Sequence, residues 1–172
     1  MKKLLIVVDY QNDFVNGTLG FDDAIELEKP IANRIKSAKD NGEEVVFTKD
    51  VHEDNYLMSE EGKNLPISHC IRNSGGEDFF GEIKELSKEH LVFEKNTFGS
   101  SLLFDYLKEN HFDQITLIGL VSYICVLSNA VIAKAANPDA HIIIEKDLTS
   151  GIDKKLQNEA FDVLKNIHIQ IK

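Results

Sequence analysis

The sequence predicts an α/β protein: a three-layer, doubly wound sheet of about six mainly parallel strands with helices on both faces. Two observations support this class. Short apolar runs rich in β-branched residues, such as residues 4–8 and 114–118, are typical of strands buried on both faces of a sheet. Segments with apolar residues at helical spacing alternate with these runs, which favours parallel strands linked by helices. We expect residues 1–172 to form a single domain.

The expected strands cover, in chain order, residues 4–8, 44–48, 91–93, 114–118, 140–144 and 167–171. The expected helices cover residues 28–41, 82–88 and 102–110, a segment that begins near Cys125, and residues 154–166. Two other segments show no sustained period. Residues 11–20 carry the turn signal Asn16-Gly17, and residues 52–76 form a long irregular segment. A loop of that length in a compact domain is usually functional.

Composition narrows the function classes. A net charge of −10 argues against a nucleic-acid groove and against an anionic membrane surface. No apolar run approaches the ~20 residues of a membrane span, and no cleavage site follows the short apolar start. The two cysteines, Cys70 and Cys125, do not form a disulfide framework, which fits a reducing compartment. We therefore expect a soluble cytoplasmic protein that binds neither nucleic acid nor membrane.

Reactive side chains follow the expected strand ends. Asp9, Asp50 and Lys95 each come just after a strand, and Cys125 begins the helix after the fourth strand. Ligands of open α/β sheets bind beyond the carboxyl ends of the strands, so these four side chains would project from one rim. Each also has a structural interpretation: a buried apolar cysteine, a turn or cap aspartate, a solvated lysine. Their joint placement favours a catalytic site.

The chemistry that these side chains suggest is nucleophilic. A helix N-terminus favours the thiolate form of a cysteine, so Cys125 would attack a carbonyl group. Asp9 would accept the thiol proton and return it to an amine leaving group, while Lys95 would hold that carboxylate and offset its charge. Backbone N–H groups of the turn before Cys125 would stabilise the oxyanion. This predicts acyl transfer through a thioester, followed by hydrolysis.

A second group of side chains lies in and before the long irregular segment: Asp50, His52, Glu61 and His69. Histidines and carboxylates are ordinary ligands for zinc and its first-row neighbours. The alternative is a set of solvated loop residues, because a loop can place ligands almost anywhere. The other four histidines have no comparable group of potential ligands near them and are interpreted as structural or surface residues: His90, His111, His141 and His168.

With these residues in place, the chain resembles the isochorismatase-like cysteine hydrolases, and within them the nicotinamidases. The matching segments occur in family order between residue 5 and about residue 150: DYQNDF (9–14), TKDVH (48–52), LPISHC (65–70), KNTFGS (95–100) and GLVSYICV (119–126). The resemblance implies the isochorismatase-like hydrolase fold and a triad of Asp9, Lys95 and Cys125. It also implies a cis peptide bond between Leu120 and Val121, which would turn the Val121 and Cys125 N–H groups toward the oxyanion.

The resemblance further implies a divalent metal, zinc first, that binds the ring nitrogen of the substrate. Asp50, His52 and His69 match the metal ligands of nicotinamidases, and Glu61 matches a glutamate used in one branch. The segment after His52 lacks the second histidine that many members use. Phe14 and Phe98 match aromatic residues that flank the substrate ring, and Leu65 stands where many nicotinamidases carry a tryptophan.

The expected function is therefore an amidohydrolase that converts nicotinamide to nicotinate and ammonia through a thioester on Cys125. One alternative is another C–N hydrolase of the family, of the carbamoyl-amide or ureide type, that works without metal. A non-catalytic binding module on the same fold and a phosphorylated receiver-like signalling module are further alternatives. The expected partners are a small amide substrate and other copies of the chain in a homo-oligomer.

Overall fold

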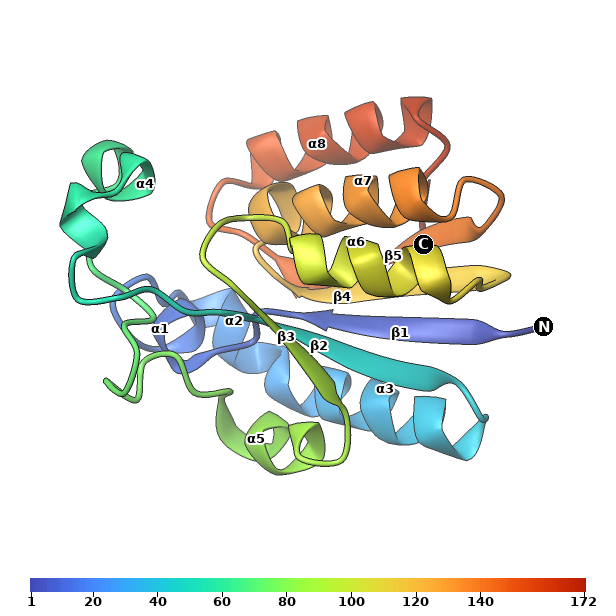
Figure 1. The fold of residues 1–172 in the computed structure, drawn as a ribbon, viewed down its shortest axis with the longest axis horizontal. Coiled ribbons are helices and arrows are strands. Elements are labelled where there is room, and N and C mark those ends of the chain that lie inside the picture. The colour runs from blue at the N-terminus through green and yellow to red at the C-terminus, as the bar shows by residue number, and fades with distance from the viewer.

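Six parallel strands form one sheet in a computed structural model that describes residues 1–172, with the order β3-β2-β1-β4-β5-β6 (Figure 1). The strands are β1 (Lys3–Val8), β2 (Glu44–Asp50), β3 (Leu91–Lys95), β4 (Gln114–Leu120), β5 (His141–Ser150) and β6 (Gln170–Ile171). This architecture confirms the predicted α/β class.

The strand order reverses beside the central strand. The chain passes from β1 outward to β2 and β3, then crosses back to place β4 on the other side of β1. Val8 at the end of β1 pairs with Thr48 of β2 and with Gly119 of β4, so these carboxyl ends lie level. A switch point of this kind is where α/β sheets bind ligands.

Helices cover both faces of the sheet (Figure 1). One layer contains α6 (Ser101–Glu109), α7 (Leu127–Ala136) and α8 (Lys154–Asn166), and the other contains α1 (Asn12–Val15), α2 (Asp22–Glu26), α3 (Glu28–Asp40) and α5 (Gly81–Ser87). Successive residues of β1 serve the two cores in turn: Leu4 and Ile6 pack in the first layer, Leu5 and Val7 in the second. Because side chains alternate along a strand, a strand covered on both faces is apolar throughout.

β2, β3 and β4 each end two residues later than predicted, and three larger differences occur towards the C-terminus. β5 continues past Ile144 to Ser150, which pairs with Leu120 after a register shift in β4. β6 is shorter than predicted because residue 167 still caps α8 and His168 adopts a left-handed φ of 65°. The predicted helix at Cys125 begins with a π-helical turn, η2 (Ser122–Val126), before α7.

The segment of residues 52–76 is not wholly irregular. It contains a 3₁₀ turn, η1 (Tyr56–Met58), and the short helix α4 (Glu60–Asn64), which stands apart from the other helices (Figure 1). The Ser59 hydroxyl caps α4 by accepting a 2.9 Å hydrogen bond from the Gly62 N–H. The prediction of no regular structure is wrong here, and wrong also for α1, because helices of one turn have too few residues to show a period. No helix has both the length and the apolar character needed to cross a membrane.

Candidate active site

Asp9, Lys95 and Cys125 meet beyond the carboxyl ends of the central strands. Asp9 follows β1, Lys95 ends β3, and Cys125 lies in the η2 turn after β4. The Lys95 Nζ lies 2.6 Å from the Asp9 Oδ2 and 3.8 Å from the Cys125 Sγ. Their exposed fractions are 0% for Asp9, 8% for Lys95 and 7% for Cys125. The ammonium group therefore contacts both the carboxylate and the thiol.

Further contacts fix the orientation of the Asp9 carboxylate. The Thr48 hydroxyl donates a 2.7 Å hydrogen bond to the Asp9 Oδ1, so Thr48 and Lys95 each hold one of its oxygens. The same Lys95 ammonium lies 3.3 Å from the Asp50 Oδ1 and so links Asp9 and Cys125 to a second cluster of polar side chains. Asp9 itself adopts a left-handed φ of 45°, which aspartate tolerates better than most residues.

Burial dominates the protonation of this group. It raises the pKa of the Asp9 carboxyl, against the attraction of Lys95. Burial alone would lower the pKa of Lys95, but Asp9, Cys125 and Asp50 outweigh it and raise that pKa. Burial also raises the pKa of the Cys125 thiol well above its usual range, and Lys95 opposes this only in part.

The thiolate expected from the helix N-terminus is therefore not the favoured resting form, since desolvation outweighs the helix dipole at this buried sulfur. The alternative is a proton transfer inside the site. Asp9 and Cys125 both contact the Lys95 ammonium, so moving the thiol proton to Asp9 keeps one negative charge beside that ammonium. Such a transfer produces the nucleophile only when it is needed.

The turn before Cys125 supplies a free backbone donor. The Leu120–Val121 peptide bond is cis, which confirms the expectation from the family resemblance. The Val121 carbonyl accepts hydrogen bonds from the N–H groups of Ile124 and Val126, whereas the Val121 N–H makes none within the protein. An unpaired N–H beside a nucleophile is the donor that an oxyanion requires.

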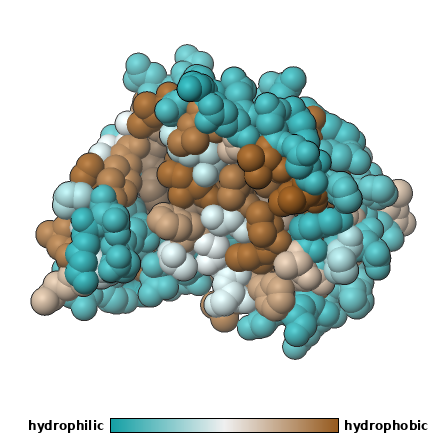
Figure 2. Space-filling model, turned by 90° about the horizontal axis from the view of Figure 1, so that it is seen from above, coloured by the Kyte–Doolittle hydropathy of each residue, from teal (hydrophilic) through white to brown (hydrophobic).

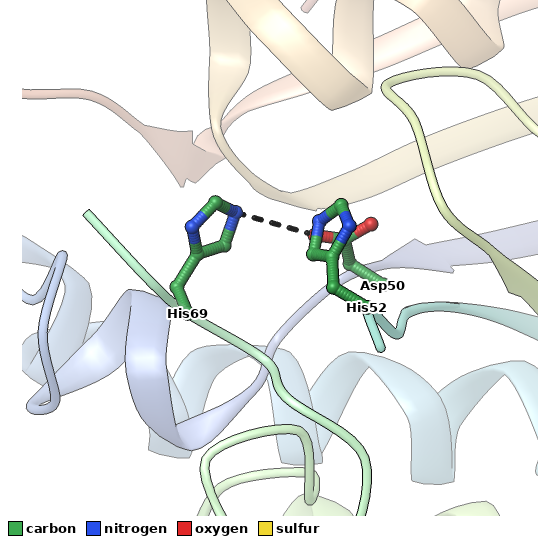
Figure 3. A group of neighbouring side chains, drawn as sticks. All are labelled: Asp50, His52 and His69. Carbon is green, nitrogen blue, oxygen red and sulfur yellow. Dashed lines mark hydrogen bonds and ion pairs between the residues drawn. The ribbon is translucent and has the colours of Figure 1, made fainter. Parts of the chain in front are cut away.

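Asp50, His52 and His69 form a buried cluster of potential metal ligands. Their carboxylate and imidazole donor atoms all lie within 4.8 Å of one another. The Asp50 Oδ2 is 2.9 Å from the His52 Nε2 and 3.6 Å from the His69 Nε2, and both rings face this carboxylate (Figure 3). This is three of the four metal ligands predicted from the sequence, held close enough to share one ion.

Glu61 comes from α4 and lies at the edge of this cluster. Its Oε1 is 3.6 Å from the His69 Nε2 and 3.8 Å from the His52 Nε2, while its Oε2 is buried without a hydrogen-bond partner. A buried carboxylate oxygen without a partner is costly. A cation bound between Glu61 and the two imidazoles would satisfy this oxygen, so the residues present fit a divalent metal.

The same groups shift one another's protonation in the metal-free protein. Burial would raise the pKa of Asp50, but hydrogen bonds from His52 and His69 and the charge of Lys95 hold it below its usual range. Burial would lower the pKa of His69, but its hydrogen bonds to Asp50 and Glu61 raise that pKa to about 9. A positive charge is therefore favoured at this place before any metal binds.

A pocket of about 330 Å³ opens above these groups. Cys125, Asp50, Glu61 and His69 line its polar part. Its walls are mainly apolar and include the three predicted substrate-binding residues together with two further aromatic side chains: Phe14, Leu65, Phe98, Phe21 and Tyr123. Figure 2 shows hydrophobic side chains gathered around a hollow on this face. The pocket suits a flat apolar ring that carries one polar group.

Comparison with known proteins agrees with this geometry. The isochorismatase domain family matches residues 3–171. The chain belongs to this family. Among solved structures, the nicotinamidase PncA of Bacillus subtilis is 29% identical with a TM-score of 0.86, and the match covers 99% of both chains.

Two further solved structures share the fold. N-carbamoylsarcosine amidase of Thermoplasma acidophilum is 25% identical with a TM-score of 0.82, over 100% of this chain and 96% of the other. The pyrazinamidase of Pyrococcus horikoshii, solved in complex with zinc, is 23% identical with a TM-score of 0.86, over 100% of this chain and 99% of the other.

In this member of the isochorismatase family, Gln11 positions the end of β2. Its side-chain amide donates hydrogen bonds to the carbonyls of Asp50 (2.7 Å) and Glu77 (2.8 Å), and its Oε1 accepts one from the Asp50 N–H (2.7 Å). Gln11 thus pairs with Asp50 as a neighbouring strand would. Sequence reasoning assigned it no role, although its place two residues after Asp9 was an available signal.

Asn129 plays a similar part for the nucleophile. Its Nδ2 donates to the Cys125 carbonyl (2.8 Å) and the Phe98 carbonyl (3.2 Å), and its Oδ1 accepts from the Ser100 N–H (3.0 Å). The family's cysteine turn is thereby joined to the loop that follows Lys95. A fully buried asparagine within a helix is unfavourable unless it is bonded. The sequence analysis assigned Asn129 no role, because its burial and its partners are visible only in the structure.

Proposed function

We propose that this protein is a cysteine-dependent amidohydrolase that deamidates nicotinamide to nicotinate and ammonia. The observation that carries the proposal is the contact of one buried Lys95 ammonium with both Asp9 and Cys125 at the base of an aromatic pocket. The similarity to the Bacillus subtilis nicotinamidase supports the substrate class. The active unit is a single domain of residues 1–172.

Acylation uses Cys125 and Asp9 in turn. The Cys125 sulfur attacks the carbonyl carbon of the amide as Asp9 takes the thiol proton, and the Lys95 ammonium keeps the carboxyl and the sulfur in contact. The N–H groups of Val121 and Cys125 donate to the oxygen that becomes negative. Asp9 then returns the proton to the amide nitrogen, the C–N bond breaks, and ammonia leaves a thioester behind.

Hydrolysis of the thioester reverses these roles. A water molecule attacks the acyl carbon and gives a proton to Asp9, the C–S bond breaks, and Asp9 passes the proton to the Cys125 sulfur. The products are nicotinic acid, which ionises, and the regenerated thiol. One amide and one water thus give one acid and one ammonia, with no other reactant.

Asp50, His52, His69 and Glu61 would hold a divalent metal, zinc first. When bound, such an ion supplies a Lewis acid for the ring nitrogen of the substrate. Around it, Phe14, Phe98 and Leu65 would pack on the ring and keep the amide beside Cys125. The buried unpaired oxygen of Glu61 supports a cation at this place.

The second candidate is a carbamoyl-amide or ureide hydrolase that works without metal. The similarity to N-carbamoylsarcosine amidase favours it, as does Leu65 at the position where many nicotinamidases carry a tryptophan. Metal content decides between the two, because a pyridine ring has a nitrogen to offer an ion and a ureide has no such ring.

The test is ammonia release from nicotinamide, pyrazinamide and several aliphatic amides, with and without a chelator. We expect nicotinamide turnover that the chelator abolishes. Cys125→Ala should lose all turnover with an unchanged circular dichroism spectrum, while the matched variant Cys70→Ala should retain it. Turnover by Cys125→Ala would refute the thioester mechanism, and turnover of ureides alone, without metal, would favour the second candidate.

The proposal also includes a cytoplasmic location and a homo-oligomer. Two apolar side chains that line the pocket are also exposed, with exposed fractions of 44% for Phe98 and 37% for Ile124. Such residues favour contact with another copy of the chain. Light scattering on the purified protein tests this, and a monomer at micromolar concentration would refute it.

A further inference from the structure

A second cavity lies on the other side of the metal cluster. It measures about 330 Å³, and its lining is mainly polar. His52 and Lys95 line this cavity, whereas Cys125, Asp50 and Glu61 line the first pocket. The two cavities share no lining residue. His52 and Lys95 therefore form the partition between the second cavity and the catalytic group.

The two nitrogens of His52 face different surroundings. Its Nε2 lies 2.9 Å from the Asp50 Oδ2, inside the cluster. Its Nδ1 has no hydrogen-bond partner in the protein, yet it is not among the side-chain atoms that are cut off from solvent. The outer nitrogen thus reaches solvent, and the cavity that His52 lines is the second one. Water in this cavity would contact Lys95, whose ammonium group contacts Asp9 and Cys125.

The reaction order makes a second opening useful. After the first half-reaction, the acyl group is bonded to Cys125 and occupies the apolar pocket. Ammonia must then leave and water must arrive while the ring lies in that pocket. Apolar walls also give no hydrogen bonds to such small polar molecules, whereas the second cavity offers carboxylates, amides and a hydroxyl.

We propose that the second cavity is the route by which ammonia leaves and the hydrolytic water reaches the thioester, past His52 and Lys95. This inference rests on the proposed amidohydrolase function. The charged side chains at the cavity balance: Arg72 lies 2.9 Å from Glu53 and 3.2 Å from Glu94, and Lys95 adds a second positive charge. A polar lining without net charge suits the passage of two neutral molecules, water and ammonia.

Two asparagines allow the cavity to be filled without removing a contact. Asn55 and Asn96 come from different segments, both are exposed, and neither side chain makes a hydrogen bond in the structure. Asn55→Phe and Asn96→Phe would each obstruct the route. The assay follows the first turnover of nicotinamide by rapid quench, with ammonia and acyl-enzyme measured separately, the latter by intact-protein mass.

If the cavity carries water, both variants should form acyl-enzyme that accumulates, and kcat should fall about tenfold or more with little change in the first acylation step. Lys63→Phe, on α4 but lining neither cavity, is the matched control and should keep wild-type kinetics. Ile152→Trp, at the first pocket, should instead raise KM without accumulation of acyl-enzyme.

Wild-type kcat and no accumulation in both asparagine variants would overturn the route and leave the proposed function intact. Absence of ammonia release by the wild-type protein would instead overturn the proposed function. If the wild-type protein hydrolyses another amide, the same comparison on that amide decides the route.

Discussion

Gln11→Leu tests whether the end of β2 depends on a side-chain amide. The substitution leaves three buried backbone groups without a partner: the N–H and carbonyl of Asp50 and the carbonyl of Glu77. Each such group costs about 2 kcal/mol, so the three together cost about 6 kcal/mol. Burial of the leucine side chain returns about 2 kcal/mol. We therefore expect the free energy of unfolding to fall by about 4 kcal/mol.

Urea denaturation followed by far-ultraviolet circular dichroism measures this loss, which suits a chain without tryptophan. Gln157→Leu is the matched control, because the Gln157 side chain makes a single hydrogen bond: its Oε1 accepts one from the Ser122 hydroxyl at 3.0 Å. That control should lose at most about 1 kcal/mol. Equal losses in the two variants, or a loss below about 1 kcal/mol in Gln11→Leu, would refute the reasoning.

Two further predictions concern protonation and backbone geometry. His69 has a pKa of about 9 in the metal-free protein, so a metal must displace its proton and should bind more tightly as pH rises toward about 9, by up to about tenfold per pH unit. The same proton stabilises the metal-free fold below the ordinary pKa of 6.5, and this stabilisation is lost as pH rises through about 9. Chelator competition and urea denaturation across this pH range measure the two effects. A metal affinity or a free energy of unfolding that does not change with pH would contradict the corresponding prediction. Gly119→Ala should prevent folding, because Gly119 has a φ of +108° and a Cβ there would lie 2.1 Å from the Val8 carbonyl oxygen. Gly42→Ala, at φ +67° with no atom within 4 Å, should cost only about 1 kcal/mol, and equal yields of folded protein for both would contradict this reading.

The juxtaposition of the candidate catalytic residues was predictable because parallel strands carry them. A run of apolar residues marks a buried strand, and the carboxyl ends of such strands meet at one edge, so Asp9, Asp50 and Lys95 could be placed together before any contact was known. The local chemistry was harder to predict. Whether Cys125 rests as a thiol depends on how completely it is buried, and a sequence pattern shows periodicity rather than depth.

The candidate metal cluster and the strand boundaries depend on non-local contacts that a sequence pattern does not show. His69 reaches His52 because residues 69–72 run beside the end of β2, with the His52 N–H bonded to the Cys70 carbonyl at 2.9 Å. That pairing joins separate segments of the chain, so no hydrophobic period in the sequence indicates it. The extension of β5 to Ser150 has the same origin, since pairing with Leu120 holds a stretch that is too polar to read as a buried strand.

The position of α4 allows metal binding to be detected by proteolysis, without any substrate. This helix packs chiefly against η1 and stands apart from the sheet, yet it carries Glu61, whose carboxylate reaches the histidine cluster (Figure 1). A bound ion would hold α4 against the histidine cluster through Glu61. Removal of the ion by a chelator would free the helix. Trypsin cleavage after Lys63 should then be slow in the loaded protein and fast in the stripped one. Cleavage after Lys63 would thus report whether a cation is bound at this cluster.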